Sequence, residues 1–322
     1  MTEQKIDSRS SAGRRAAGRR AADTRAAASE PRAPVGLDEI IAAATALAWA
    51  ARWDIAERLL TSAQASAQTA ARAHGQADGP GSGLDDAAAG RLALARAAVA
   101  VHHDFRTGGS RWAPAAMTAA ETTADSADPA GRRQLDLLRL QYDYAIMLTE
   151  PDGTPRFGPQ GRDPVRMAGL AQRAEELAGA TTDVAGAGWA AFYRGVIADN
   201  LIGDRDGAPR WFARALDAGE RAADDYLAGE ALRHLGDHEM ESGDLAAARA
   251  SWERSAELWA GIGNVTGVLA QQLLLADLAF QEGNASGGAA TAAEVSRWAG
   301  AAGLTFYQRS ADELVESHRP PH

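Results

Sequence analysis

The sequence lacks cysteine and contains a single lysine, Lys5. Without cysteine, the chain can form neither disulfide bonds nor a thiolate zinc site, and nothing indicates an oxidising compartment. A nucleotide-binding P-loop, a protein kinase and a Schiff-base enzyme each need a lysine inside a folded domain. Because Lys5 lies near the N-terminus in a segment with few apolar residues, these classes of enzyme are almost excluded.

Long apolar runs are also missing. The longest, residues 40–51, is about half of the roughly 20 residues that a membrane helix requires, and Arg52 ends it. The paired arginines at 14–15 and 19–20 are not followed by an apolar segment, as they would be in a twin-arginine export signal. We therefore expect a soluble, cytoplasmic protein that does not enter a membrane.

Alternating patterns of β-branched, aromatic and polar residues, which mark strands, are absent as well. The residues that are abundant, alanine together with leucine, arginine and glutamate, favour helix. The predicted fold class is all-α.

Residues 1–34 form a basic segment in an acidic chain. They include eight basic and four acidic residues, a net charge of +4, so the rest of the chain carries −14 of the total of −10. With almost no large apolar side chains, the segment is predicted to be a disordered tail. A basic arm that touches nucleic acid or the acidic body of the chain is the alternative. Nucleic-acid binding by the acidic body is disfavoured, because phosphate contacts need clustered cations.

A 40-residue repeat organises the remaining domain, residues 35–320. Gly203-Asp204 returns as Gly243-Asp244 and again as Gly283-Asn284. The glycine can take the left-handed conformation that ends one helix, and the Asp or Asn can cap the next. Each copy is therefore predicted to be an antiparallel helical hairpin. The hairpins are expected at 184–222, 226–262 and 266–302.

Helical periodicity predicts three further hairpins upstream and one helix at the C-terminal end. The upstream hairpins begin at Leu37, near Asp85 and after Asp128-Pro129. The last helix, about 304–317, would cap the open end of the stack. The expected architecture is thus about six hairpins and a capping helix.

The loop 149–163 within the third hairpin is longer than a helical hairpin requires. The helix after it has a clear start signal, with Asp163 as N-cap and Pro164 at the first helical position. Because long loops often carry function, Arg156 and the exposed-looking Phe157 are candidate binding residues.

The residues of the best copy follow a known pattern. They are Leu235-Gly236 in the first helix, Gly243-Asp244 at the turn, and Ala248, Trp252 and Ser255 in the second helix. This pattern resembles the tetratricopeptide repeat, most clearly over 184–302. The period exceeds the usual length of about 34 residues in that family. The 40-residue repeat is similar to the longer repeats in sensor and scaffold regions of bacterial LuxR-type and AfsR-type regulators.

The resemblance implies a non-enzymatic α-solenoid that binds a protein or peptide through residues on the first helix of each hairpin. In this sequence those groove positions are Tyr193, Arg194, Ile197, Asn200, Glu230, Arg233, His234, Asp237, Glu241, Asp277 and Gln281. An ordinary solvated helix face is an alternative interpretation of these residues. A second functional hypothesis is a regulatory sensor that binds a small molecule or peptide and acts on a transcriptional regulator.

Motifs for catalysis or cofactor binding are weak. His234 and His238 stand four residues apart, but their segment matches no zincin signature and has no third ligand nearby in sequence. Residues 186–191 fit a dinucleotide fingerprint only formally, since no predicted strand precedes them. We therefore expect no enzymatic activity, no cofactor and no metal.

Overall fold

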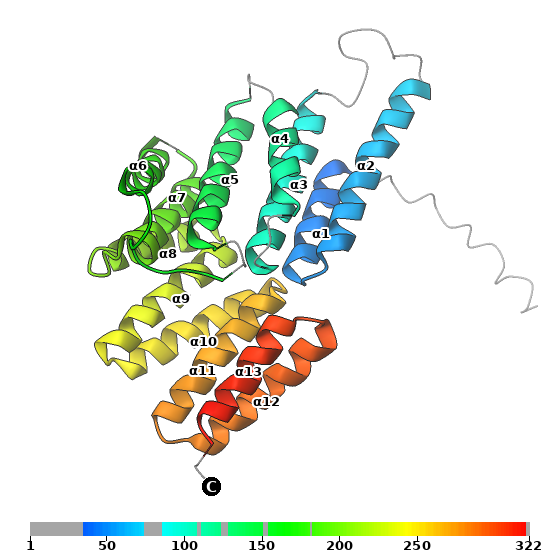
Figure 1. The fold of residues 1–322 in the computed structure, drawn as a ribbon. Coiled ribbons are helices and arrows are strands. Elements are labelled where there is room, and N and C mark those ends of the chain that lie inside the picture. The colour runs from blue at the N-terminus through cyan, green and yellow to red at the C-terminus, as the bar shows by residue number, and fades with distance from the viewer. Residues whose placement is uncertain are drawn as a thin grey trace, which may run out of the picture. The chain divides into compact units, whose positions relative to one another are not determined.

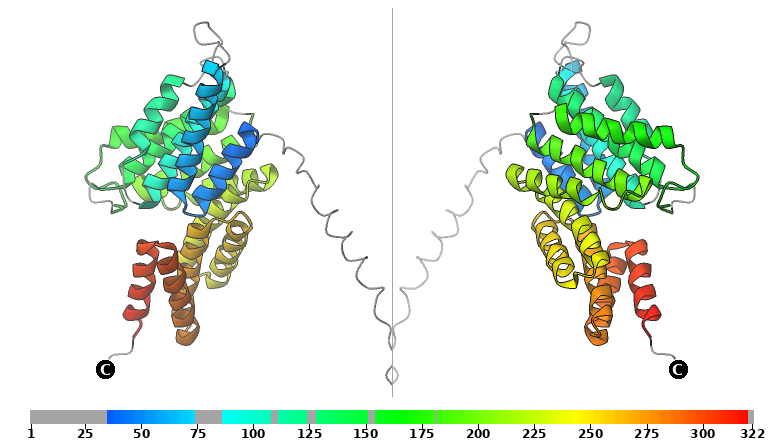
Figure 2. Two further views of the ribbon diagram at one scale, coloured as in Figure 1. Left: turned by 90° about the vertical axis from the view of Figure 1, so that its right-hand side faces the viewer. Right: turned by 90° about the vertical axis from the view of Figure 1, so that its left-hand side faces the viewer.

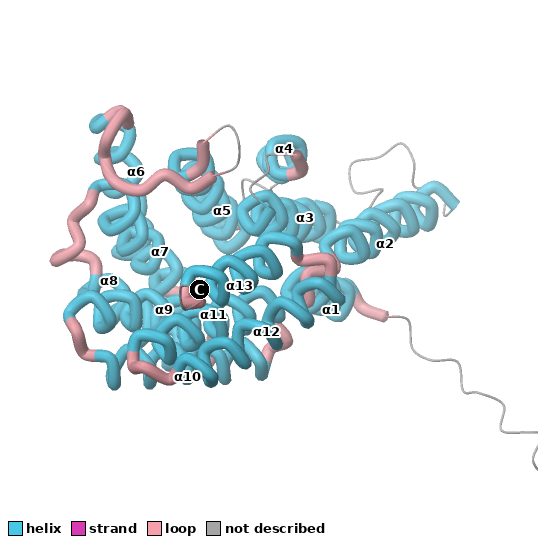
Figure 3. The backbone as a smooth tube through the Cα atoms, turned by 60° about the horizontal axis from the view of Figure 1, so that its bottom comes forward, coloured by secondary structure: helices cyan, strands magenta, loops and turns pink. Residues whose placement is uncertain are grey.

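The structure, a computed structural model, describes residues 35–73, 86–107, 111–123, 128–150, 154–180 and 182–319. These ranges contain thirteen α-helices and one π-helix, and no strand beyond an isolated bridge between Thr149 and Pro155 (Figure 3). The predicted all-α class is therefore confirmed. From Leu37 onward the chain forms one compact unit. The predicted tail, residues 1–34, lies outside the described residues.

The helices follow one another as hairpins in which each helix packs on its neighbours in the chain (Figure 1). The first three hairpins are α1 (Leu37–Trp49) with α2 (Trp53–Ala73), α3 (Asp86–Thr107) with α4 (Ala113–Thr123), and α5 (Pro129–Leu148) with α6 (Pro164–Ala180). Each of these hairpins begins within a few residues of the start expected from the sequence.

The 40-residue repeat builds the next three hairpins. They are α7 (Val184–Val196), continued by the π-helix η1 (Ile197–Ile202), with α8 (Pro209–Ala222); α9 (Asp225–Ser242) with α10 (Leu245–Gly261); and α11 (Val265–Gln281) with α12 (Ala285–Ala302). A last helix, α13 (Thr305–Ser317), packs on α11 and α12. In both side views the orange and red helices, α11 to α13, lie below the blue and green helices of the first hairpins (Figure 2).

The turns inside the repeat hairpins have the geometry that the sequence predicts. Gly203, Gly243 and Gly283 are left-handed, with φ of 79°, 85° and 83°. Asp244 and Asn284 then cap α10 and α12 by accepting hydrogen bonds from backbone N–H groups three residues further on. Asp204 instead accepts a hydrogen bond from the Gly207 N–H within a turn, and α8 begins only at Pro209.

A second set of turns, between hairpins, repeats with the same period and was not predicted. Ala223-Asp224, Gly263-Asn264 and Gly303-Leu304 each begin with a left-handed residue, with φ of 53°, 74° and 73°. Asp224 and Asn264 cap α9 and α11 through their side chains. The glycine pattern is interrupted by Ala223, which explains why the sequence alone did not reveal these turns.

The π-helix η1 accounts for an irregularity in the repeat. Eight positions separate Gly195 from Gly203, whereas seven separate Gly236 from Gly243. The first copy therefore holds one extra residue, which the wider π-helical turn over Ile197–Ile202 accommodates. Upstream of this turn, equivalent positions in the two copies are 41 residues apart rather than 40.

Gly195 and Gly236, which precede the turns of the first two copies, each lie against an aromatic ring. A Cβ added to Gly195 would lie 2.6 Å from Phe212, and a Cβ added to Gly236 would lie 2.5 Å from Trp252. Phe212 and Trp252 are both buried. The small residue of each first helix therefore makes room for the aromatic residue of its partner helix.

Two glycine-to-alanine variants are expected to change stability in opposite directions. Gly236→Ala should destabilise the fold by about 1–3 kcal/mol, because the buried Trp252 indole occupies the space that the added methyl needs. Gly169→Ala should stabilise it by about 0.5–1 kcal/mol, because Gly169 lies on an exposed face of α6 with open space around it. Urea unfolding of both variants measures the difference. Shifts of the same sign would contradict this packing.

Candidate ligand-binding cavity

A cavity of about 1450 Å³ is lined by the first helices of all six hairpins and by the start of α13. We call it the interior cavity. Most pockets for drug-sized molecules are smaller, roughly 300–1,000 Å³. Side chains that are far apart in the sequence thus face one shared space.

Nine of the eleven groove residues expected from the sequence line the interior cavity. They are Tyr193, Asn200, Glu230, Arg233, His234, Asp237, Glu241, Asp277 and Gln281. The other two face elsewhere. Ile197 is fully buried in the hydrophobic core, and Arg194 donates a hydrogen bond to Glu175 of α6 at 2.7 Å.

The extra residue in η1 explains these two misplaced positions. With the 41-residue offset that holds upstream of η1, the equivalents of Glu230, Arg233, His234 and Asp237 are Trp189, Phe192, Tyr193 and Val196, and all of them line the cavity. The 40-residue offset expected from the sequence places these positions of α7 one residue too late. The signal that could have corrected it was the longer spacing between Gly195 and Gly203.

The loop 149–163 contributes Phe157 to the cavity lining but not Arg156. Arg156 instead pairs with Glu150, with 2.6 Å between Nε and Oε1. The loop is attached to η1 because the Gly158 N–H donates a hydrogen bond to the Asn200 carbonyl at 2.8 Å. Arg162 holds its two ends together by donating to the carbonyls of Met147, Arg156 and Gly158.

Aromatic side chains gather around Tyr226. Its ring centroid lies 5.7 Å from that of Trp49, 6.1 Å from that of His102 and 5.3 Å from that of Trp189. Tyr193 follows, 6.4 Å from Trp189. These five residues, which we call the aromatic cluster, come from α1, α3, α7 and α9 and all line the cavity.

A buried ion pair beside the aromatic cluster joins α3 to α9. Arg106 Nη2 donates to Glu230 Oε1 at 2.9 Å and to the Tyr226 hydroxyl at 3.4 Å. The two charged side chains are only 16% and 12% exposed. The N–H groups on Nε and Nη1 of Arg106 make no hydrogen bond with any residue that the structure describes, so three of its five donors are available to a ligand.

A second charged group lies where η1 faces α9. Asp199, whose side chain is 5% exposed, approaches Arg205 Nη1 at 3.0 Å and His238 Nε2 at 3.4 Å. Arg205 also pairs with Glu241. Burial raises the pKa of Asp199, and the neighbouring Arg205 and His238 oppose that shift. The group is held by charge, while Asp199 Oδ1 and His238 Nε2 are buried without a hydrogen-bond partner among the described residues.

Two histidines of the cavity are held neutral. Burial, together with the charge of Arg106, lowers the pKa of His102 to about 3. Burial and the charge of Arg233 lower the pKa of His234 well below its usual value. The His234 ring stacks on Phe212 with 4.8 Å between centroids, and its Nε2 accepts a hydrogen bond from Arg233 Nη1 at 2.9 Å. In the described ranges, no three His, Asp or Glu side chains are arranged as metal ligands.

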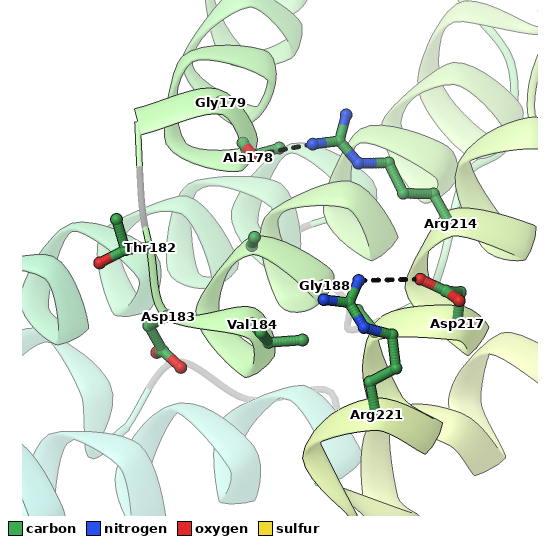
Figure 4. A pocket seen from close by; sticks show the side chains of 11 residues that line it. Ala178, Gly179, Thr182, Asp183, Val184, Gly188, Arg214, Asp217 and Arg221 are labelled. Atoms are coloured by element: carbon green, nitrogen blue, oxygen red, sulfur yellow. Dashed lines mark hydrogen bonds and ion pairs between the residues drawn. The ribbon is translucent and has the colours of Figure 1, made fainter.

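A smaller pocket of about 370 Å³ lies between α6, α7 and α8 (Figure 4). Its arginines are engaged by the protein, since Arg214 donates to the Ala178 carbonyl at 2.9 Å and Arg221 donates to Asp217 at 3.3 Å. We therefore take the interior cavity as the candidate site.

The class defined by these observations is an all-α protein built of helical hairpins around a cavity lined by their first helices. Among the described helices, none has both the length and the apolar character needed to cross a membrane. No protein-family model matches the sequence, and a search of the curated proteins gives no match. The tetratricopeptide resemblance therefore rests on the residues quoted above.

Proposed function

We propose that this chain is a non-enzymatic, cytoplasmic scaffold that binds a segment of a partner protein in the interior cavity. The observation that carries the proposal is the position of three exposed aromatic residues. Phe105, Phe157 and Phe306 line the cavity and are 42%, 61% and 57% exposed. They come from α3, the loop 149–163 and α13.

Exposed large apolar side chains that line a cavity are typical of interaction sites. The three rings belong to α3, the loop 149–163 and α13, and a chain segment can cover rings from several elements at once. The volume of the cavity also favours a segment over a drug-sized molecule.

The charges of the lining support a protein partner over nucleic acid. The carboxylates are those of Asp199, Glu230, Asp237, Glu241 and Asp277, and the guanidinium groups are those of Arg106, Arg205, Arg233 and Arg309. Five negative and four positive groups, several of them paired, do not form the cationic surface that a phosphate backbone needs. Nucleic-acid contact through the basic residues 1–34 stays a separate hypothesis.

A regulatory sensor is the second candidate, and the aromatic cluster favours it. A planar small molecule held there would contact α1, α3, α7 and α9 at once. Its binding would therefore favour one packing of α1 and α3 against α7 and α9. Such a ligand would co-purify with the chain without any partner protein.

Quantitative capture from lysate of the native cells tests the two candidates. The baits are the full-length chain, a Phe105→Ser/Phe157→Ser variant and a control Val165→Ser/Trp298→Ser variant, in which the changed residues are similarly or more exposed but lie outside the cavity. The scaffold proposal predicts a partner that is lost from the first variant and kept by the second. Equal capture by both variants contradicts it. A bound small molecule without a partner favours the sensor.

A further inference from the structure

Building on the proposed function, we propose that the bound segment carries an uncharged aromatic side chain that packs in the aromatic cluster, and that Arg106 binds a backbone carbonyl oxygen next to it. The inference names the recognition element of the partner. It rests on the shape, charge and hydrogen-bonding groups of one part of the interior cavity.

The geometry of the cluster favours an aromatic side chain over an aliphatic one. Centroid separations of 5.3–6.4 Å with tilts of 30–52° already join Trp49, Trp189, Tyr193 and Tyr226 in edge and offset contacts. These residues are only partly buried and face the cavity. A further ring can add the same contacts, which stabilise aromatic pairs beyond the area they bury.

The charge of the cluster favours an uncharged side chain. Arg106 places a cation beside Tyr226, so a lysine or arginine of the partner would meet a like charge in a poorly solvated place. Glu230 is already engaged by Arg106, and it would repel an aspartate or glutamate. The buried pair is neutral as a whole, and a neutral ring is the side chain that disturbs it least.

Unused hydrogen-bond donors lie beside the cluster, which points to the carbonyl oxygens of a peptide. Besides three N–H groups of Arg106, the Tyr193 hydroxyl has no partner among the described residues, and burial raises its pKa so that it keeps its proton. Donors without acceptors are satisfied by a chain that brings carbonyls.

Selection from a phage-displayed library of random twelve-residue peptides on the immobilised full-length chain tests the inference. The selected peptides should share a Trp, Tyr or Phe. Changing that residue to Leu in a synthetic peptide should weaken binding about 30-fold, as truncating an anchor in a well-packed pocket does. Because this change is in the peptide, it cannot disturb the fold of the protein.

Three protein variants complete the test, each checked for helical content by circular dichroism. Trp49→Ala should weaken binding of the synthetic peptide about 30-fold, whereas Trp298→Ala, on an exposed face outside the cavity, should leave it unchanged. Arg106→Lys keeps a cation opposite Glu230 but removes the unused guanidinium donors, and should weaken binding about tenfold.

The outcomes separate the inference from the proposed function. Peptides that bind at the cavity without a shared aromatic residue overturn the inference and leave the scaffold proposal standing. Unchanged binding to the Arg106→Lys variant overturns the carbonyl contact. Failure to select any peptide contradicts both.

Discussion

Replacing Glu230 with alanine is expected to destabilise the chain by roughly 3 kcal/mol. The variant leaves the Arg106 guanidinium, which stays protonated, in a place where it is only 16% exposed and has lost its carboxylate. This loss of stability is at the lower end of what breaking a buried ion pair costs, because the arginine faces a cavity in which its free N–H groups can be hydrated. The pair joins residues 124 positions apart, so its loss should loosen the packing of α3 on α9.

Urea unfolding at pH 7, followed by circular dichroism, measures this effect. The control is Arg106→Leu/Glu230→Leu, which removes both charges and should cost less than Glu230→Ala alone, since no uncompensated charge stays buried. A double variant whose cost equals the sum of the costs of Arg106→Leu and Glu230→Leu would contradict a coupled ion pair.

Acidification is expected to destabilise the chain through His102 and His234. Burial lowers both pKa values below the ordinary value of 6.5, so the folded protein keeps these rings neutral while the unfolded chain takes up protons. The stability that they contribute is complete above pH 6.5 and falls by about 1.4 kcal/mol per pH unit for each histidine below it. For His102 this loss continues down to about pH 3.

Unfolding free energies at pH 7.0 and 5.5 test this prediction. The two histidines together should account for a loss of about 3 kcal/mol over that interval, and His234→Gln should remove about half of it. Burial raises the pKa of Asp199, so uptake of a proton by this carboxylate on acidification favours the folded state and opposes the effect of the histidines. An unchanged slope in His234→Gln would show that this ring titrates normally.

The hairpins could be predicted from local signals because each turn is encoded by two adjacent residues. A left-handed glycine followed by a capping side chain fixes the end of one helix and the start of the next, as at Gly243-Asp244. Where another residue takes the left-handed position, as Ala223 does, the local signal fades although the turn remains. The start of α6 could also be predicted from a local signal, because Asp163 caps the helix.

The third repeat copy shows how a weak sequence match can preserve the packing. It has Ala276 and Ala292 where the second copy has Gly236 and Trp252. Both alanines are fully buried. The larger residue in the first helix thus accompanies a smaller one in the second helix, and the two helices still touch. The sequence shows the two substitutions, and the structure shows that both alanines are buried where the helices meet.

The aromatic cluster could not be predicted, because it depends on long-range packing. Trp49, His102 and Arg106 lie upstream of the clear repeat, where no alignment fixes which side chains face inward. Their partners on α9 are more than a hundred residues away. A one-residue insertion in η1 likewise shifts which side chains of α7 face the cavity, and periodicity alone is too coarse to detect such a shift.

The central claim is that a partner occupies the interior cavity, and hydroxyl-radical footprinting of the full chain with and without the captured partner tests it most directly. Six exposed apolar side chains serve as probes. Phe105, Phe157 and Phe306 line the cavity, while Ile146, Val165 and Trp298 are similarly or more exposed outside it. The scaffold account predicts that oxidation of the three phenylalanines falls when the partner binds and that oxidation of the other three is unchanged. Protection of Ile146, Val165 or Trp298, with the phenylalanines still oxidised, would contradict it.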